Sequence, residues 1–503
     1  MLKEFNKIIM AGMFNFAMDN RAKPKIYIPV GCLMDIPTAS IITGAKGETL
    51  YNGGLGQVVG VVGAGNNFKS TLIHYMTLSA ASKIAEATKT YILTYDTEVN
   101  ISFDRLEHFA AQFPSLGEGT IQGNDPIWTI MDKSSLPANE WGDKLFEYME
   151  EKQKDKKDYV TIECILDPYT HKPMSIPRPT FVEIDSFTEF EAASVAEMLS
   201  GDLDSKDTNT YAMKQGNFKT KFLSQLPGRC PASSTYITLT AHTGDKVNMG
   251  MQPWEEPSKK LQFLKTGDSI KSVGSKFSFL TNIAYQAHTG SLFYNQGTKG
   301  PEYPKDPNDI TKADLNKVTL TTLRSKSGPS GGNIEVLISQ SEGVLPSLTE
   351  FHFLRQNKSG TPGFGITGSD RSYALDIYPE VSLSRTTVRS KLDTDPKLRR
   401  AVNITAELLQ LATYHRMVIE SGLMCAPAEL YEDIKKLGYD WNILLDTRGY
   451  WTLNQYSHPV PYLNTVDLLK MRKGLYKPWW YDAKVKELTN TNESNANTKK
   501  KEK

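Results

Sequence analysis

Cysteine is scarce in this sequence, and neither sign of charge is in excess. The 503 residues include four cysteines, Cys32, Cys164, Cys230 and Cys425, which lie far apart and form no C-x-x-C pair. This spacing argues against a zinc site or a disulfide framework and fits a reducing cytoplasm. The formal net charge of +1 excludes a protein coated in positive charge, but a local cluster of Lys and Arg is enough to contact nucleic acid.

Long apolar runs are absent as well. No run approaches the ~18 residues that cross a bilayer, and the N-terminus lacks the long apolar region and cleavage site of a signal peptide. We therefore expect a cytoplasmic protein without membrane contact. The stretch 1–20 instead predicts an amphipathic helix, which packs either on its own domain or on a neighbouring subunit. Its apolar positions are Leu2, Phe5, Ile9, Met13 and Phe16.

Short β-branched runs alternate with helical segments from about residue 26 to residue 354. This alternation predicts an α/β fold with a mostly parallel central sheet. Region 100–178 expands this core, and in it we expect a charged, solvated helix at 141–158 and a hairpin at 159–176. The expected strands are 58–62, 90–96, 179–185, 235–241, 279–287, 317–325 and 333–339.

The composition of the chain changes near residue 355. A Gly/Ser-rich stretch at 355–372 predicts a linker to a small α+β domain. Beyond it, Asp395 and Pro396 are typical of the N-cap and first residue of a helix. The last residues are polar, low in complexity and expected to be disordered. The predicted parts are an N-terminal oligomerisation arm at 1–27, an α/β core at 28–355, a C-terminal domain at 356–488 and a tail at 489–503.

The stretch GAGNNFKSTL, which begins at Gly63, directly follows the apolar run VVGVV. It is similar to a phosphate-binding loop, G-x-x-x-x-G-K-[ST], with Phe68 in place of the second glycine. In such loops backbone N–H groups and a helix N-terminus bind phosphate oxygens, the lysine reaches the β- and γ-phosphates, and the hydroxyl holds Mg²⁺. Because Phe68 does not adopt positive φ as easily as glycine, we expect the loop to be wound differently there. The predicted nucleotide-binding residues are Gly63, Ala64, Gly65, Asn66, Asn67, Phe68, Lys69, Ser70 and Thr71.

Two further strand ends carry carboxylates. The run PTFVEID ends at Asp185, a position from which a carboxylate usually holds Mg²⁺, so we expect Ser70 and Asp185 to be the metal ligands. An acidic residue at an ordinary strand end is the alternative for Asp185. The run TYILTYDTE offers Glu98 as the base for an attacking water. Since the carboxyl ends of parallel strands meet at one edge of a sheet, these residues together predict ATP hydrolysis.

These motifs resemble those of the RecA family, and most closely those of phage recombinases of the UvsX type. The resemblance covers about residues 28–350 and depends on the runs TG....YNGGLGQVVGVVGAGNNFKSTL, YDTEV and VEIDSF. The UvsX-type loop itself carries Phe before Lys, so Phe68 is expected to be a subfamily trait. The resemblance implies a RecA-like P-loop ATPase core, ATP and Mg²⁺ as cofactors, and the cytoplasm of a host bacterium as the location. Region 100–178 and the chain after 356 depart from the family.

The same resemblance assigns roles to individual residues. Lys69 and Glu98 match the lysine that contacts the phosphates and the glutamate that activates water. The stretch LTAHTGD resembles the strand end that senses the γ-phosphate, so His242 is the expected sensor; a histidine buried at a strand end is the alternative. Arg324 and Lys326 match basic residues that neutralise the γ-phosphate of the next subunit in trans. Their alternation is equally typical of a solvent-facing edge strand.

Two loops of the family bind DNA, and they correspond to about 200–217 and 244–277 here. The second is polar, rich in glycine and long for an ordinary connection, which is typical of functional loops. Its Trp254 or Phe263 is available to stack on bases, while lysines would contact phosphates irrespective of sequence. The stretch FNFA at 14–17 fits the F-x-x-A pattern by which some members dock on the next subunit. The expected DNA-contacting residues are Lys246, Lys259, Lys260, Lys265, Lys271 and Lys276.

Residues and resemblance together predict an ATP-dependent homologous recombinase that acts in recombination, repair and recombination-dependent replication. Its subunits would form a helical filament on single-stranded DNA, with ATP at each interface, and pair that strand with a homologous duplex. The expected partners are therefore both forms of DNA, further copies of this chain, and phage mediator and single-strand-binding proteins. Two alternatives remain: a hexameric replicative helicase with the same ATPase core, and a filament-forming structural protein with weak ATPase activity.

Overall fold

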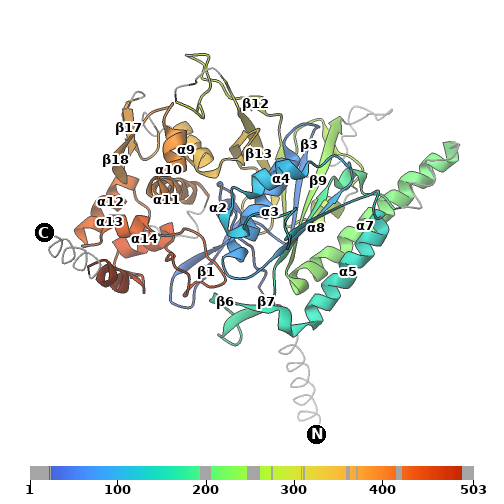
Figure 1. The fold of residues 1–503 in the computed structure, drawn as a ribbon, viewed down its shortest axis with the longest axis horizontal. Coiled ribbons are helices and arrows are strands. Elements are labelled where there is room, and N and C mark those ends of the chain that lie inside the picture. Colours follow the sequence, from blue (N-terminus) through green and yellow to red (C-terminus); the bar gives the residue numbers. More distant parts are fainter. Residues whose placement is uncertain are drawn as a thin grey trace, which may run out of the picture.

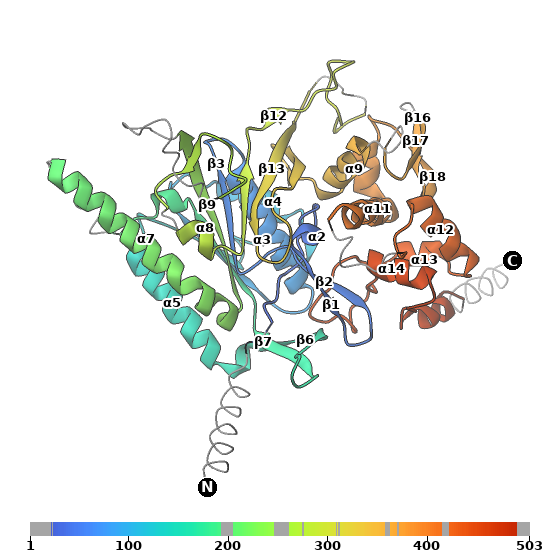
Figure 2. The same ribbon diagram turned by 180° about the vertical axis from the view of Figure 1, so that it is seen from behind.

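The computed structural model has a large sheet at its centre with helices on both faces (Figure 1), and Figure 2 shows the same arrangement from behind. The chain is therefore α/β, as predicted. For 205–213 and 245 only the backbone is described. The described residues are 22, 24–192, 205–245, 261–273, 276–307, 309, 312–357, 363–369, 372–414 and 422–489.

Within these residues the central sheet has eleven strands and a parallel core. The parallel strands lie in the order β11-β3-β9-β8-β4-β5. Antiparallel strands β13, β14 and β15 continue the sheet beyond β11, and the short strands β10 and β12 pair with β9 and β13. The bounds are β3 (Val58–Gly63), β4 (Tyr91–Asp96), β5 (Trp128–Asp132), β8 (Thr180–Asp185), β9 (Thr235–Asp245), β10 (Asp268–Ile270), β11 (Ile283–Ala287), β12 (Ser291–Leu292), β13 (Leu315–Ser325), β14 (Asn333–Ser339) and β15 (Gly343–Val344).

Each of the seven predicted strands is present, and only β14 has the boundaries that were predicted. The two largest shifts are of four residues: β9 ends later, at Asp245, and β11 begins later, at Ile283, because the preceding residues form helix α8 (Lys276–Leu280). Phe277 of α8 packs directly on β3: a Cβ on Gly60 would lie 2.5 Å from its ring, so only glycine fits there. Strand β5 was not predicted, because its sequence WTIMD is short and shows no clear alternation of apolar and polar residues.

Helices cover the two faces of the sheet with separate apolar clusters. On one face α5 and α7 lie side by side in both views, and Trp141 and Phe222 bring them together over Val182 of β8. On the other face α3 packs through residues such as Ile73 and Met76. Helix α5 confirms the charged helix predicted at 141–158. The bounds are α2 (Asp35–Thr38), α3 (Lys69–Ala85), α4 (Phe103–Ala110), α5 (Ala138–Lys154), α7 (Ser205–Ser233) and α9 (Pro346–Gln356).

Two hairpins lie beside the N-terminal edge of the parallel strands. One is the predicted hairpin at 159–176, now seen as β6 (Tyr159–Leu166) and β7 (Pro173–Pro177). The other is β1 (Ser40–Thr43) with β2 (Thr49–Asn52). The chain enters the core close by, where the Tyr27 N–H donates to Asn52 Oδ1 (2.7 Å).

The C-terminal chain forms helices and a small sheet on the side of the molecule away from α5 and α7 (Figure 1). Part of the predicted linker is structured, since 366–369 forms a strand. Asp395 caps its helix as predicted, accepting from the Lys397 and Leu398 N–H groups (2.9 and 3.0 Å). The bounds are β16 (Ile366–Ser369), β17 (Ser372–Leu375), β18 (Tyr378–Leu383), α10 (Val388–Thr394), α11 (Pro396–Tyr414), α12 (Pro427–Lys436), α13 (Trp441–Leu445) and α14 (Thr465–Arg472).

This C-terminal part shares one apolar cluster with the core. Polar contacts join them as well: Asp467 accepts from the Thr49 N–H (2.9 Å), and the Trp451 Nε1–H donates to the Tyr51 carbonyl (3.0 Å). The boundary at 356 stays a prediction. Residues 1–21, with the FNFA stretch, and 490–503 lie outside the described residues. No helix in the described part of the chain has both the length and the apolar character needed to cross a membrane.

Candidate nucleotide site

Four adjacent strands bring the predicted residues to one edge of the sheet. Along the order β3, β9, β8, β4, Gly63 lies opposite His242, and Asp185 lies opposite Asp96. Neighbouring strands are about 4.8 Å apart. The phosphate-loop residues, the histidine, the Asp185 carboxylate and the turn that carries Glu98 therefore lie in a row roughly 15 Å long, at the carboxyl edge where open α/β sheets bind ligands.

Phe68 keeps the backbone conformation that a glycine would take. Its φ is 57° and its ψ is 22°, in the left-handed region, and it immediately precedes α3. The expectation that the loop is wound differently at this residue is therefore wrong. A non-glycine residue pays about 1–2 kcal/mol for this conformation, so other contacts of the loop must offset the strain.

Those contacts lie at the end of β11. The Phe68 ring packs over Gly290, where an added Cβ would lie 2.9 Å from the ring and 3.0 Å from Val318. The Asn67 Nδ2–H donates to the Ala287 carbonyl (3.0 Å), and Asn67 is buried. Phe68 is thus accommodated before Lys69 because the chain that follows β11 has a glycine, Gly290, against the ring.

Lys69 and the first turn of α3 point their donors into the loop. The Lys69 Nζ donates to the Ala64 carbonyl (2.7 Å). Burial lowers the pKa of Lys69, while the charges of Asp185 and Glu98 oppose this effect. The Leu72 N–H donates to the Phe68 carbonyl (3.0 Å), and the first N–H groups of a helix lack intrahelical acceptors. The positive end of the helix dipole adds to the attraction for an anion.

Asp185 is held by two hydroxyl groups. Thr240 of β9 donates to its Oδ1, and Ser70 of α3 also bonds to the carboxylate. Burial raises the pKa of Asp185, although His74 and the two hydroxyls work in the opposite direction; the charge of Glu98 adds to the rise. A cation at this position would favour the ionised carboxylate.

A buried ion pair lies beneath this carboxylate. His74 Nδ1 is 2.9 Å from Glu183 Oε2, and Glu183 also accepts from Thr94 (2.7 Å). Burial lowers the pKa of His74, but the charge and hydrogen bond of Glu183 outweigh it and leave that pKa raised. Burial acts in the opposite sense on Glu183 and raises its pKa, but the charge of His74 and the hydrogen bonds from His74 and Thr94 outweigh burial and leave the pKa of Glu183 lowered. Both shifts favour the charged forms of the pair, and the charge of His74 works to lower the pKa of Asp185.

Glu98 and His242 meet although 144 residues separate them. His242 Nε2 lies 3.1 Å from Glu98 Oε1, and both side chains are partly exposed. The His242 N–H donates to Thr188 Oγ1 (2.8 Å) on the turn that follows β8. The predicted base and the predicted sensor are thus in contact, which fits the sensor interpretation better than that of a buried histidine.

Asp96 holds the turn that presents Glu98. Its Oδ1 accepts from the Glu98 and Val99 N–H groups (2.9 Å each). Its Oδ2 accepts from the Asn100 and Ile101 N–H groups (2.9 and 3.1 Å). A nearly fully buried carboxylate therefore fixes four successive amides, and with them the direction of Glu98.

Arg324 and Lys326 lie at the opposite edge of the sheet. Ser325 pairs with Ile283 of β11, which in turn pairs with Val59 at the start of β3. Four residues of strand, or about 13 Å, separate that level from Gly63. Arg324 donates to the Ser278 carbonyl (2.6 Å), and Lys326 is exposed. Neither residue reaches the phosphate loop of its own subunit, and their action in trans stays a prediction.

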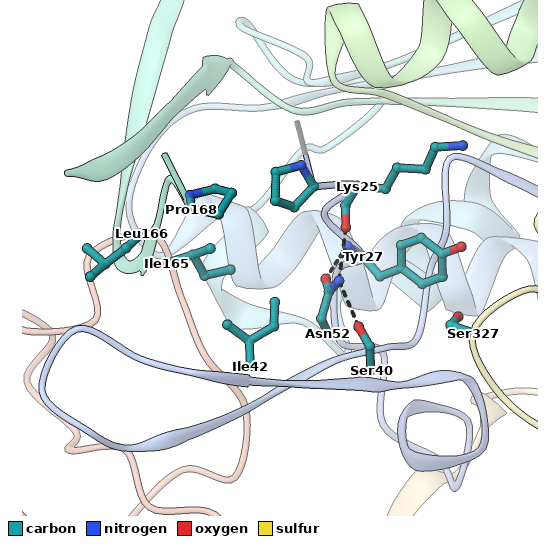
Figure 3. Close-up of a pocket in the computed structure, with 10 residues that line it drawn as sticks. Lys25, Tyr27, Ser40, Ile42, Asn52, Ile165, Leu166, Pro168 and Ser327 are labelled. Carbon is teal, nitrogen blue, oxygen red and sulfur yellow. Dashed lines mark hydrogen bonds between the residues drawn. The ribbon is translucent and has the colours of Figure 1, made fainter. Parts of the chain in front are cut away.

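A cavity of about 390 Å³ opens beside these residues (Figure 3). Lys25 and Tyr27 line it from the start of the described core, and Ser327 lines it from the turn after β13. Asn52 also lines it and donates to the Lys25 carbonyl (2.9 Å) and to Ser40 (3.3 Å). Residues 24–27, the described end of the predicted N-terminal arm, therefore lie beside Lys326.

Three predicted DNA-contacting lysines can be placed. Lys265, Lys271 and Lys276 are exposed, and Lys271 lies over Gly244 of β9. Phe263 is 39% exposed but packs against Gly331, so only part of its ring is open to a base. Lys246, Lys259, Lys260 and Trp254 lie outside the described residues, as do residues 200–204 of the first predicted loop. The rest of that stretch, 205–217, belongs to helix α7, so the prediction of a loop is wrong there.

The donors at this edge fit a nucleoside triphosphate and Mg²⁺. Lys69 and the amides of the loop and of α3 suit phosphate oxygens. Ser70 and Asp185 offer hard oxygen atoms side by side, and Mg²⁺ usually takes one or two protein ligands beside phosphates and water. No cluster of three His, Cys, Asp or Glu that could hold a metal occurs in the ranges that the structure describes.

Sequence reasoning missed several residues of the site. The sequence assigns Asp96 no role of its own, and no motif marks Thr188 or Thr240. Asn67 was predicted to bind nucleotide, but its contact with Ala287 was not predicted. For Asp96 a signal was available, because an aspartate followed by a turn often accepts from the next N–H groups. No protein-family model and no curated protein matches this chain.

Proposed function

We propose that this protein is an ATP-dependent homologous recombinase with a RecA-like core. The observation that carries the proposal is the row of Lys69, His242, Asp185 and Glu98 on four adjacent strand ends. Phosphoryl transfer to water requires groups that bind the phosphates, ligands for a metal ion and a base for the attacking water. Lys69, the Ser70–Asp185 pair and Glu98 are suited to these three roles. The family resemblance of the same residues supports recombination as the process.

The chain's own groups would act as follows. Lys69 exchanges the Ala64 carbonyl for phosphate oxygens and compensates charge on them. Ser70 and Asp185 hold Mg²⁺, which supplies further charge compensation at the phosphates when bound. Glu98 orients a water molecule and accepts its proton. His242 keeps Glu98 directed by their 3.1 Å contact and releases it when the γ-phosphate competes for the imidazole.

Assembly would complete the site. Arg324 and Lys326 lie on the far edge of the sheet, so they would serve the nucleotide of a neighbouring copy, as an arginine finger does. Lys265, Lys271 and Lys276 would contact single-stranded DNA through its phosphates, which gives salt-dependent binding without sequence preference. The specificity for homologous sequence would then come from base pairing between the DNA strands and not from contacts with the protein.

Electron microscopy combined with ATPase measurements tests this proposal. We expect helical filaments on single-stranded DNA and hydrolysis that DNA stimulates. Closed rings that unwind duplex DNA would establish the helicase alternative, and filaments without turnover would establish the structural one. Lys69→Ala should abolish hydrolysis while the fold is retained, as checked by circular dichroism. Hydrolysis that survives this change would refute the site assignment.

A further inference from the structure

The described end of the second predicted DNA loop, at 244–277, pairs with β9, the strand that carries His242. Strand β10 pairs with the end of β9, with Ile270 opposite Thr243. The Lys271 N–H then donates to the His242 carbonyl (2.8 Å). Residues 261–271, the described end of this loop, therefore return to the nucleotide edge.

Gln286 of β11 makes a second contact with this loop segment. Its side chain is buried, with the residue only 2% exposed. The Oε1 atom accepts from the Lys265 N–H (2.9 Å), and the Nε2–H donates to Asp268 Oδ2 (2.6 Å). Both ends of the amide are thus bonded to the loop segment, one to its backbone and one to a carboxylate.

The residue after Gln286 contacts the phosphate loop. Gln286 pairs with Val62 at the end of β3. The Ala287 carbonyl accepts from Asn67 (3.0 Å), and three residues later Gly290 lies under the Phe68 ring. One short stretch of chain therefore touches the nucleotide loop through its backbone and the 261–271 segment through a side chain.

We propose that Gln286 is a positioning residue that couples the nucleotide state of the phosphate loop to the 261–271 segment. Phosphate binding that moves Asn67 or Phe68 shifts the Ala287 peptide, and the neighbouring amide transmits this shift to Lys265 and Asp268. Coupling between two sites is reciprocal. A ligand on the segment therefore alters hydrolysis, and this half of the inference rests on the proposed DNA-stimulated ATPase.

Variants that reverse the direction of the Gln286–Asp268 hydrogen bond test this contact by itself. Gln286→Glu keeps the size of the side chain and an acceptor for Lys265, but it sets one carboxylate against that of Asp268. The double variant Gln286→Glu/Asp268→Asn restores a hydrogen bond in the opposite direction, from the new amide to the new carboxylate. Gln112→Glu makes the same charge change at an exposed position and serves as the control.

The first measurement is the ratio of ATPase rates with and without single-stranded DNA. In Gln286→Glu we expect the DNA-independent rate to stay within about twofold of the wild type, and the stimulation to fall at least about fivefold, the lower end of typical allosteric coupling. The double variant should recover most of the stimulation, and the control should keep all of it. Stimulation that persists in Gln286→Glu, or fails to return in the double variant, overturns the proposal.

The second measurement needs no DNA. Cleavage by trypsin after Lys265 and Lys271 is followed by mass spectrometry with and without a non-hydrolysable ATP analogue. The analogue should change the cleavage rates severalfold in the wild type and in the double variant, and not in Gln286→Glu. An equal change in all variants, or none in the wild type, refutes the coupling. If the wild type lacks DNA stimulation, the proposed function fails, and this measurement still decides the role of Gln286.

Discussion

Asp96→Asn tests whether a buried carboxylate directs the predicted catalytic base. The asparagine oxygen can still accept from the Glu98 and Val99 N–H groups, but its NH₂ group faces the donors of Asn100 and Ile101. Two hydrogen bonds to a charged acceptor are lost, each with a net contribution of about 1.5–3 kcal/mol. The turn must therefore rearrange. Because it lies at an exposed edge and can relax, we expect the free energy of unfolding to fall by only about 2 kcal/mol.

The effect on catalysis should be larger than the effect on stability. A displacement of about 1 Å at a catalytic group costs on the order of 100-fold in rate. Asp96 does not contact the phosphate loop, so nucleotide affinity should stay within a factor of about two. Single-turnover ATP hydrolysis, binding of a fluorescent nucleotide and urea unfolding measure the three quantities separately.

Glu98→Gln is the matched control for this variant. It removes the base and leaves the four bonds to Asp96 in place, so hydrolysis should fall as far while the free energy of unfolding stays unchanged. If Asp96→Asn hydrolyses ATP at the wild-type rate well below its melting temperature, the turn does not direct the base and the reasoning is refuted. A loss of nucleotide affinity as large as the loss in rate would equally contradict it.

Three further outcomes follow from the structure. Phe68→Gly and Phe68→Ala both remove the ring, but only glycine relieves the strain of the left-handed backbone at this residue. In urea unfolding the Gly variant should therefore be more stable than the Ala variant by about 1 kcal/mol. The reverse order would show that the backbone at residue 68 is unstrained. Burial raises the pKa of Asp467 to about 7, so its contribution to stability is complete below about pH 4 and is lost as the pH rises through about 7. Asp467→Asn should remove up to about 4 kcal/mol of this pH dependence, seen in unfolding at pH 4 and pH 8. Mixing Lys69→Ala with Lys326→Ala subunits should restore ATPase activity that neither variant has alone, because some interfaces then combine an intact phosphate loop with an intact Lys326. A mixture that stays inactive would exclude action in trans.

The strands and the row of site residues were predictable because their signals are local. The run that ends at Gly63 and the run that ends at Asp185 are β-branched and apolar, and parallel strands must align their carboxyl ends. The contacts that position these residues were not predictable in the same way. Gln286 lies in an ordinary strand, and only the pairing of β11 with β3 brings it beside the phosphate loop.

Phe68 shows a different limit of sequence reasoning. Its identity predicts an altered backbone, because a side chain disfavours positive φ. The structure instead retains that φ, since Gly290, more than 200 residues later, leaves space for the ring. A departure from a motif at one position is here compensated by a small residue at another, and no pattern within the loop reveals the second position.

The contacts of the β1–β2 hairpin have a consequence for synthesis of the chain. Thr49 bonds to Asp467, 418 residues later, and Tyr51 accepts from Trp451, 400 residues later. At about 5–20 residues per second, a ribosome needs roughly 20–80 s to make the intervening chain. During that interval the hairpin has emerged without the segment that covers it. Hairpin residues that are buried in the folded chain, such as Leu50 and Tyr51, are therefore exposed on the nascent chain, and transiently exposed apolar surface is prone to aggregation.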